Sequence, residues 1–312
     1  MDKIVFFHMN QLGDLLFSLP VVKAAKQELN AKIFSVVKTS LAPLLTASNL
    51  VDEAMAKDRN IVKFLKKEKV GKAILFSESP SSLLYVYLSG IKSRIGFNTA
   101  SLSFLLTKKT ERVGVPSLFN NRELGFAVGL KSIRQDYVGI INIPEENIEN
   151  VKKWFGDNNL DASKTIAISI GASKGRQDKC LEEHKWIEVI NVLSEKGFNC
   201  VLSGAVWEKE ILNSTAKKCR IAPKVFAAEN GILDSAAFLK KCGLFMGIDS
   251  GAMHLAAAVG TKCVAVFGYT DPSQVGPMPL KNHIVIKKEK ISDITSEDII
   301  SKVLRLQYNN KD

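Results

Sequence analysis

The sequence has few cysteines and no long apolar run, and both absences limit where the protein can act. No apolar stretch approaches the roughly 18 residues that a helix needs to cross a bilayer. Residues 4–7 are too short for the apolar core of a signal peptide. The five cysteines are odd in number and form no CxxC pair. They predict reduced thiols rather than a disulfide framework or a zinc site, and we expect a cytoplasmic protein.

The common nucleotide-binding and metal-binding motifs are also absent. Neither GxGxxG nor GxxxxGK[ST] occurs, which argues against simple dinucleotide-binding and P-loop proteins. There is no DxD pair and no His/Cys/Asp cluster with metal-ligand spacing, so we expect neither a metal nor a cofactor. No basic stretch is interleaved with aromatic residues as in nucleic-acid-binding modules, so we expect no nucleic-acid partner.

The composition is that of a globular protein with an excess of positive charge. Hydrophobic residues make up 46% and charged residues 24% of the 312 residues, which is ordinary for a folded chain, and the length suits two domains. The net charge is +11, and residues 59–131 carry 13 basic against four acidic side chains. This local excess indicates either a well-solvated surface or attraction to an anionic partner.

Strand and helix signals alternate along the whole chain. Apolar strand patterns at residues 3–7 and 165–170 are each followed by helical periodicity. This alternation predicts two consecutive α/β domains, each built on a parallel sheet. The polar residues 156–159 form the best candidate linker. We therefore predict domains over 1–158 and 159–312, with a last amphipathic helix at 296–306 that could pack back on the N-terminal domain.

Residues 244–278 carry the strongest local signal for an anion-binding site. They read as a strand, the turn Asp249-Ser250-Gly251, a helix of small apolar residues, a second strand, and a loop that begins at Gly268 and contains Thr270. In such a β-α-β unit the backbone N–H groups at the helix N-terminus attract phosphate. The crevice at the carboxyl ends of the strands is where open α/β sheets bind ligands.

Two further side chains in this segment have more than one interpretation. Asp249 would repel a diphosphate if it pointed at one, so we expect it to cap the helix or to bind hydroxyl groups of a sugar. His254, in the first helical turn, either contacts a phosphate or ribose or is a core histidine bonded to a carbonyl.

Three motifs resemble a known family. DSGxxHLAAAxG and FGxTDP in the second half, with QLGDLLFSLP at residues 11–20, resemble the ADP-heptose:lipopolysaccharide heptosyltransferases of glycosyltransferase family nine. That family has the GT-B fold, in which two Rossmann-like domains face a cleft. The resemblance implies an inverting, metal-independent transfer from ADP-L-glycero-D-manno-heptose to a Kdo- or heptose-bearing lipid A core. It also implies peripheral contact with the inner face of the inner membrane. The oligomeric state, the core position and the exact donor sugar stay open.

The resemblance also assigns roles to individual residues. The matching aspartate of the family is the proposed catalytic base, which corresponds to Asp14 here. The N-terminal domain would bind the acceptor and the C-terminal domain the nucleotide sugar. The donor-binding residues would be Ser173, Asp249, Ser250, Gly251, His254, Gly268 and Thr270. The acceptor-binding residues would be Arg94, Lys108, Lys109 and Arg112.

Asp14 has a structural interpretation beside the catalytic one. It follows the first strand and a short polar turn, where an aspartate also suits a helix N-cap. Pro20 predicts that the helix begins late or bends. One carboxylate is enough for the chemistry, because a nucleoside diphosphate leaves as a stable anion, unlike the sugar leaving group of a glycosidase. The enzyme then needs one base and a positively charged site.

Lys179 is the candidate for that positive charge. Family members commonly have a lysine followed by xWP at this point, and here Leu181 and Glu182 replace the tryptophan and the proline. Because of this departure, Lys174 and Arg176 in the same loop remain alternatives to Lys179. A solvent-exposed basic loop is the structural alternative.

Near the acceptor candidates, apolar side chains at positions 102 and 104–106 suit either the edge of a lipid or a packed core. Two other functions are compatible with parts of the sequence. A nucleotide-sugar epimerase of GT-B architecture could use the DSG turn, although no further carboxylate follows it in residues 252–255. A non-catalytic protein that binds anionic lipid would explain the charge but not the DSG and TDP turns.

Overall fold

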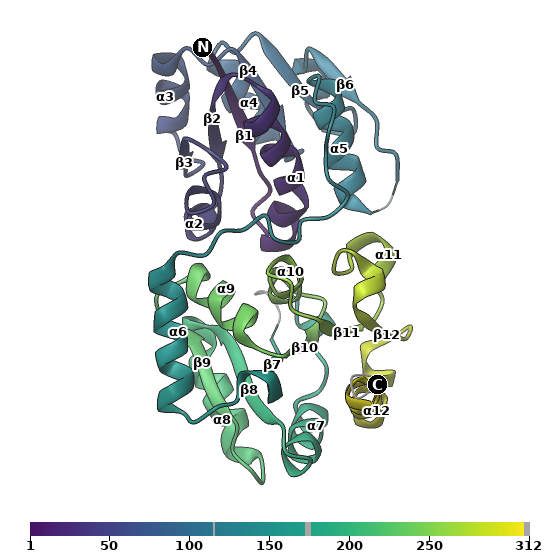
Figure 1. The fold of residues 1–312 in the computed structure, drawn as a ribbon. Helices are drawn as coiled ribbons and strands as arrows, with labels where there is room; N and C mark the ends of the chain where they lie inside the picture. The colour runs from purple at the N-terminus through teal and green to yellow at the C-terminus, as the bar shows by residue number, and fades with distance from the viewer. Residues whose placement is uncertain (115, 172–175, 309–312) are drawn as a thin grey trace. The chain divides into compact units, whose positions relative to one another are not determined.

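The computed structural model describes residues 1–114, 116–171 and 176–308. The chain divides into two compact units, Met1–Asn142 and Ile143–Asp312. In the described ranges, each unit is built on one parallel β-sheet with helices on both faces (Figure 1). This arrangement confirms the predicted α/β class with two Rossmann-like units.

The sheet of the first unit has the strand order β3-β2-β1-β4-β5-β6. Its strands are β1 (Asp2–Phe7), β2 (Ala31–Val36), β3 (Glu53–Met55), β4 (Lys72–Leu75), β5 (Ser93–Phe97) and β6 (Lys108–Thr110). The helices are α1 (Leu12–Glu28), α2 (Ala42–Thr46), α3 (Asn60–Glu68), α4 (Pro80–Leu88) and α5 (Ser117–Ala127), with the short 3-10 turns η1 (Thr39–Leu41) and η2 (Ser103–Leu105).

The faces of this sheet follow from the alternation of its side chains. Val5 and Phe7 on β1 belong to a buried cluster with residues of α3 and α4, and α1 packs against α5 on the opposite face. Helix α1 is buried from Leu15 to Val22, including Pro20. The predicted late start is wrong, because α1 already begins at Leu12 and continues through the proline.

The sheet of the second unit has the order β12-β11-β10-β7-β8-β9. Its strands are β7 (Thr165–Ser169), β8 (Asn199–Ala205), β9 (Lys224–Ala228), β10 (Leu244–Ile248), β11 (Cys263–Phe267) and β12 (Ile284–Lys287). The helices are α6 (Glu145–Asp157), α7 (Glu183–Glu195), α8 (Lys209–Lys218), α9 (Ile232–Lys241), α10 (Gly251–Ala258), α11 (Pro272–Val275) and α12 (Ser296–Tyr308). The 3-10 turns are η3 (Ala162–Lys164), η4 (Gln177–Lys179), η5 (Val206–Glu208), η6 (Leu280–Asn282) and η7 (Ile291–Asp293).

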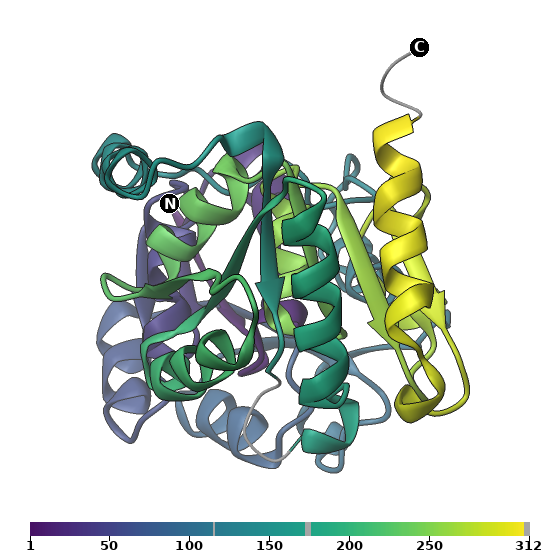
Figure 2. The ribbon, with the colours of Figure 1, turned by 90° about the horizontal axis from the view of Figure 1, so that it is seen from below.

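The first and last helices of the second unit both pack on other elements of that unit. Helix α6 groups with this unit because its Trp154 packs edge-on against Phe226 and Phe238, at 5.1 and 5.6 Å between ring centroids. Residues 156–159, the predicted linker, form the end of α6 and the turn after it. The last helix, α12, packs on α7, β11 and β12 of its own unit (yellow in Figure 2).

Each strand order contains one point where the chain reverses its direction of growth across the sheet. In the first unit this switch point lies between β1 and β4, and in the second between β7 and β10. The loops that leave the carboxyl ends of these strand pairs diverge to opposite faces and leave a crevice between them. The predicted base Asp14 follows β1, and Lys179 and Asp249 follow β7 and β10.

Candidate functional site

Three loops of the second unit are joined by side-chain contacts at the carboxyl edge of the sheet. The Lys179 ammonium, at the end of η4, forms an ion pair with Oδ2 of Asp249, directly after β10. Arg176 Nη2 donates to the Tyr269 hydroxyl at 2.6 Å, which connects the loop after β7 to the loop after β11. The Lys179 and Asp249 side chains are only 15% and 8% exposed. Asp249 therefore holds a positive charge at the switch point and does not cap α10, whose N-cap is Ser250.

The N-terminus of α10 presents an unsatisfied hydroxyl group. Ser250 has an extended backbone, and its side chain makes no capping hydrogen bond. Its Oγ atom is buried, with no hydrogen-bond partner among the described residues. A buried polar atom without a partner is uncommon in folded proteins. Together with the free N–H groups of the first turn, which begins at Gly251, this hydroxyl suits an anionic ligand.

His254 lies in the first turn of the same helix and is buried, at 4% exposure. Burial lowers its pKa from 6.5 to about 4; the negative charge of Asp249 partly opposes this shift, and the positive charge of Lys179 adds to it. The imidazole is therefore neutral near pH 7. It therefore supplies no positive charge to this site.

Gly268, in the loop after β11, packs closely against η7. A side chain at Gly268 would lie 2.9 Å from the backbone nitrogen of Ile291 in η7, so glycine allows the two segments to approach. Thr270 is half-buried, and the following Asp271 caps α11 by accepting from Ser273 N at 2.9 Å. This cap fixes the loop that carries Thr270. Ser173 and Lys174, two residues of the predicted anion-binding loop, lie outside the described residues.

Glu208, which is not among the predicted site residues, lies at the same edge after β8. Its Oε2 accepts the Ala205 N–H at 2.9 Å, and burial raises the pKa of its carboxyl. A side chain at Gly204 would lie 2.8 Å from Oε2, and one at Gly171 would collide with Oε1. The two glycines, each at or just after the end of a neighbouring strand, are the sequence signal that could have revealed this carboxylate. The neighbouring Trp207 is 68% exposed.

In the first unit, Asp14 lies in the first turn of α1, at the switch point between β1 and β4. The N-cap of α1 is Gln11, which makes no side-chain capping bond. The structural interpretation of Asp14 as the N-cap is therefore wrong. Asp14 is partly buried in this first turn.

A buried histidine supports the loop that precedes Asp14. His8 follows β1, and its Nδ1 and Nε2 lie 2.8 Å from Ser18 Oγ and 3.0 Å from Ser35 Oγ. Because Ser18 donates its own proton to Leu15 O at 2.6 Å, it must accept from Nδ1–H of His8. The other ring nitrogen then accepts from Ser35. Burial lowers the His8 pKa to about 3, so this neutral tautomer joins β1, β2 and α1.

The predicted acceptor-binding residues are distributed over both edges of this sheet. Arg112 follows β6 at the carboxyl edge, where it pairs with Glu78 and lies over the Phe97 ring at 4.5 Å. Arg94, near the start of β5, donates to Leu105 O at 2.5 Å and to Ile91 O at 2.6 Å. Lys108, at the start of β6, donates to Ala127 O at 2.7 Å. Arg94 and Lys108 thus hold neighbouring backbone, whereas Arg112 lies at the Asp14 edge.

Lys109 is exposed on β6. Lys57, after β3, is a further cation that is not among the predicted site residues. Its Nζ lies 3.3 Å from Ser79 Oγ and 3.2 Å from Ser82 Oγ at the N-terminus of α4. Burial lowers the Lys57 pKa. A partly desolvated cation with hydroxyl partners suits a carboxylate or phosphate ligand.

Comparison with known proteins places these features in one family. A family model described as glycosyltransferase family 9 (heptosyltransferase) matches residues 59–303. The lipopolysaccharide core heptosyltransferase OpsX of Haemophilus influenzae is 28% identical over 134 residues, which cover 42% of this chain and 38% of OpsX. The chain thus matches about two fifths of that relative's length. Lipopolysaccharide heptosyltransferase 2 of Escherichia coli K12 is 21% identical over 305 residues, or 91% of this chain and 87% of that protein.

Solved structures show the same fold. The crystal structure of a family 9 glycosyltransferase from Veillonella parvula has a TM-score of 0.85 at 19% identity and covers 99% of this chain and 97% of its own. That of the ADP-heptose lipopolysaccharide heptosyltransferase II of E. coli has a TM-score of 0.82 at 20% identity, with coverage of 99% and 100%. A UDP-GlcNAc 2-epimerase from Methanocaldococcus jannaschii, at 12% identity and with coverage of 99% and 100%, reaches only 0.56.

These likenesses confirm the predicted two-domain GT-B fold. The family model extends over most of the chain and includes both the loop after β7 and the DSG turn of α10. The chain therefore belongs to glycosyltransferase family 9, the heptosyltransferase family.

Proposed function

We propose that this chain transfers a heptose from ADP-L-glycero-D-manno-heptose to the inner core of lipopolysaccharide, with inversion and without a metal ion. The acceptor is a Kdo- or heptose-bearing lipid A. Support comes from family membership and from the names of the relatives, which include lipopolysaccharide heptosyltransferases and an ADP-heptose-dependent enzyme. The C-terminal unit would hold the donor, and the N-terminal unit the acceptor and the base.

The observation that carries the proposal is the unsatisfied Ser250 hydroxyl at the N-terminus of α10, in the turn that begins with the Lys179–Asp249 ion pair. A diphosphate bound here would accept hydrogen bonds from Ser250 and from the first-turn N–H groups. Lys179 would stabilise the negative charge that grows on the leaving group. Thr270 and the neutral His254 would complete the donor site, and Glu208 would accept hydrogen bonds from ribose hydroxyls.

The reaction needs one proton transfer. In our proposal the Asp14 carboxylate removes the proton of the acceptor hydroxyl as its oxygen attacks the anomeric carbon of the heptose. The bond between that carbon and the ADP oxygen breaks from the opposite side, so the configuration inverts. ADP departs with the bonding electron pair, and no acid is needed to protonate it. Arg112, Lys109 and Lys57 would bind the anionic groups of the acceptor.

In this proposal, the positive charge beside the diphosphate comes from protein groups. Among the described residues, no group of three or more His, Cys, Asp or Glu side chains is arranged to hold a metal ion. Lys179 and the N-terminus of α10 carry the charge that a metal would supply in other transferases. We therefore propose that ADP binds without a divalent cation.

The activity is tested by incubating the protein with ADP-heptose and Kdo-bearing lipid A, with excess EDTA present, and measuring the mass of the lipid. A mass increase of one heptose unit, with an anomeric configuration opposite to that of the donor by NMR, is expected. Calorimetry with ADP in EDTA tests the donor site separately. ADP binding only in the presence of magnesium would contradict metal independence, and conversion of the nucleotide sugar without any transfer would favour the epimerase alternative.

A further inference from the structure

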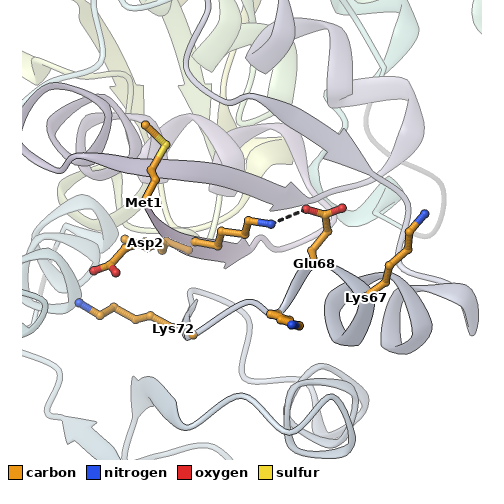
Figure 3. Close-up of a pocket in the computed structure, with 9 residues that line it drawn as sticks. Met1, Asp2, Lys67, Glu68 and Lys72 are labelled. Atoms are coloured by element: carbon orange, nitrogen blue, oxygen red, sulfur yellow. Dashed lines mark hydrogen bonds and ion pairs between the residues drawn. The ribbon is translucent and has the colours of Figure 1, made fainter.

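The first unit has a pocket of about 490 Å³ at the amino edge of its sheet, where β1 and β4 begin and α3 ends (Figure 3). Residues 1–4, 67–69 and 71–72 line it. Pockets that bind small molecules typically measure about 300–1,000 Å³, so an organic molecule of moderate size fits. Strand β1 has six residues, and its rise of about 3.3 Å per residue separates the pocket from the edge that carries Asp14 by roughly 15–20 Å. The amino-edge pocket is therefore distinct from the proposed catalytic site.

One carboxylate of the amino-edge pocket is already neutralised by lysines. Glu68 Oε2 lies 2.9 Å from Lys3 Nζ and 3.9 Å from Lys32 Nζ. The hydrogen bond from Lys3 and the charges of Lys32 and Lys67 lower the pKa of Glu68, so this carboxyl is ionised near pH 7. Its second oxygen, Oε1, accepts no hydrogen bond from the described residues. That oxygen can accept one from a hydroxyl group of a ligand.

The other lysines give the pocket an excess of positive charge. Figure 3 shows Lys67 and Lys72 on either side of the Lys3–Glu68 pair. Within the part of the chain that the structure describes, neither of the two flanking lysines forms an ion pair. Four lysines and two carboxylates line the pocket, which leaves a net charge of two positive units. A phosphate monoester carries about −1.5 to −2 at pH 7, which matches this excess.

The fold alone does not explain this cluster of lysines. Lys69, directly after α3, has φ 53° and ψ 47°, a left-handed conformation in which helices usually place glycine. The dipole of α3 favours lysines near its C-terminus, which accounts for Lys67. Lys3 and Lys72, however, lie on strands, where no comparable dipole acts. A ligand that needs positive charge accounts for the lysines of both kinds of element.

We propose that the amino-edge pocket binds a phosphate monoester of a small polyhydroxylated molecule, such as a sugar phosphate. Lys69 and Lys72 would donate charge-assisted hydrogen bonds to the phosphate oxygens, and the flexible stem of Lys67 lets its ammonium group approach the same anion. The carboxylates of Asp2 and Glu68 would accept hydrogen bonds from the hydroxyl groups. The apolar stems of the lysines would contact the carbon skeleton. This inference does not depend on the proposed transferase activity.

Calorimetry with the full chain tests the ligand class. The probes are glucose 6-phosphate and ribose 5-phosphate, and we expect at least one to bind with a Kd of about 1 mM or below. Glucuronate, which carries a single negative charge, should bind at least about fivefold more weakly, and glucose should give no binding heat. A Kd above about 10 mM for both sugar phosphates would overturn the proposal. Equal affinity for inorganic phosphate would show that the sugar is not recognised, which would also overturn it.

Two variants test the pocket in different ways. Lys69→Gly/Lys72→Gln should lower the affinity by about 25-fold, from roughly fivefold for each charge, and the glycine suits the left-handed backbone, so the fold should not be weakened. Gly71→Leu keeps every charge but should block binding, because a Cβ there meets no atom within 4 Å and the side chain would occupy open space in the pocket. Lys217→Gln/Lys240→Gln, at exposed positions of the second unit, is the matched control. Wild-type affinity in both pocket variants would overturn the proposal.

A last comparison separates this pocket from the N-terminus of α10, which also suits phosphate. In NMR spectra, the sugar phosphate should shift the amide signals of Gly71 and Lys72, and Ser250→Ala should keep the wild-type affinity. Loss of binding in Ser250→Ala, together with unchanged signals at Gly71 and Lys72, would place the ligand at α10 and overturn the proposal. Sugar phosphate binding by a chain without transferase activity would reject the proposed function and leave this inference standing.

Discussion

Removing the ammonium group of Lys179 should leave the Asp249 carboxylate nearly buried and unpaired. The Asp249 side chain is 8% exposed and that of Lys179 is 15% exposed, so water can replace little of the lost interaction. We expect Lys179→Met, which keeps an unbranched side chain of similar length, to lower the free energy of unfolding by about 2–4 kcal/mol. Asp249→Asn keeps an oxygen that can accept from Lys179, so it should cost about 1–2 kcal/mol.

The double variant separates the ion pair from other effects. With both charges removed, no unpaired charge remains, and the combined loss should be smaller than the sum of the single losses by about 1 kcal/mol or more. Urea unfolding of the four proteins measures this coupling. Strict additivity would show that the two side chains do not interact.

The titration of His254 provides an independent readout. Its pKa of about 4 reflects burial, the attraction of Asp249 and the repulsion of Lys179. In Lys179→Met the repulsion disappears while the attraction stays, so the pKa should rise; in Asp249→Asn it should fall further. NMR titration of the imidazole measures both directions. A pKa unchanged in both variants would refute the described proximity of the three groups.

The catalytic consequence follows from the position of Lys179 beside the proposed diphosphate site. Turnover of Lys179→Met should fall by about 10²–10³-fold, because the charge that develops on ADP loses its stabilising cation. A well-folded variant with nearly wild-type turnover would move this role to another cation of the same loop, such as Arg176, which lies by the Tyr269 hydroxyl.

Three other substitutions test separate parts of the molecule. Asp14→Asn should reduce turnover by about two to four orders of magnitude and leave ADP affinity unchanged; an active, folded variant would show that Asp14 is not the base. The folded-state pKa of His8, about 3, lies below its ordinary value of 6.5, so the unfolded chain binds the proton first and stability is lost as the pH falls. Between pH 6.5 and 4, we expect preferential protonation of His8 in the unfolded chain to lower the free energy of unfolding by roughly 3 kcal/mol. An equal pH dependence of the unfolding free energy in the wild type and in His8→Gln would contradict this. Gly268→Ala should destabilise by about 1–3 kcal/mol, because its Cβ would press on Ile291. A Cβ at Gly156 would have no atom within 4 Å. The control Gly156→Ala should therefore leave the temperature of thermal unfolding nearly unchanged.

The sequence predicts the centre of each sheet better than its edges. The apolar runs at residues 3–7 and 165–170 correspond to β1 and β7, whose central positions require both faces to be apolar. The edge strands are β3 and β6 in the first sheet and β9 and β12 in the second. Their short segments are partly exposed, as in Lys108–Thr110, so the apolar signal is weak.

For the site, motifs predict which residues follow the switch-point strands but not what their side chains contact. The DSG turn does place Asp249 and Ser250 at the N-terminus of α10. The ion pair between Asp249 and Lys179 joins residues 70 positions apart, and no local pattern specifies such a contact. Arg94 shows the opposite case, because an arginine that suits an anion in the sequence is used to hold two backbone carbonyl groups.

The packing of α6 determines how the chain can be shortened. Phe226 and Phe238 stack at 4.1 Å between ring centroids beneath Trp154 and are 7% and 1% exposed. Asn147 of the same helix donates to Asp234 at 2.7 Å. A separately expressed second unit that begins at residue 160 would leave both phenylalanine rings open to water and would aggregate readily. One that begins at Ile143 would keep them covered, so crystallographic and calorimetric work on that half should start there.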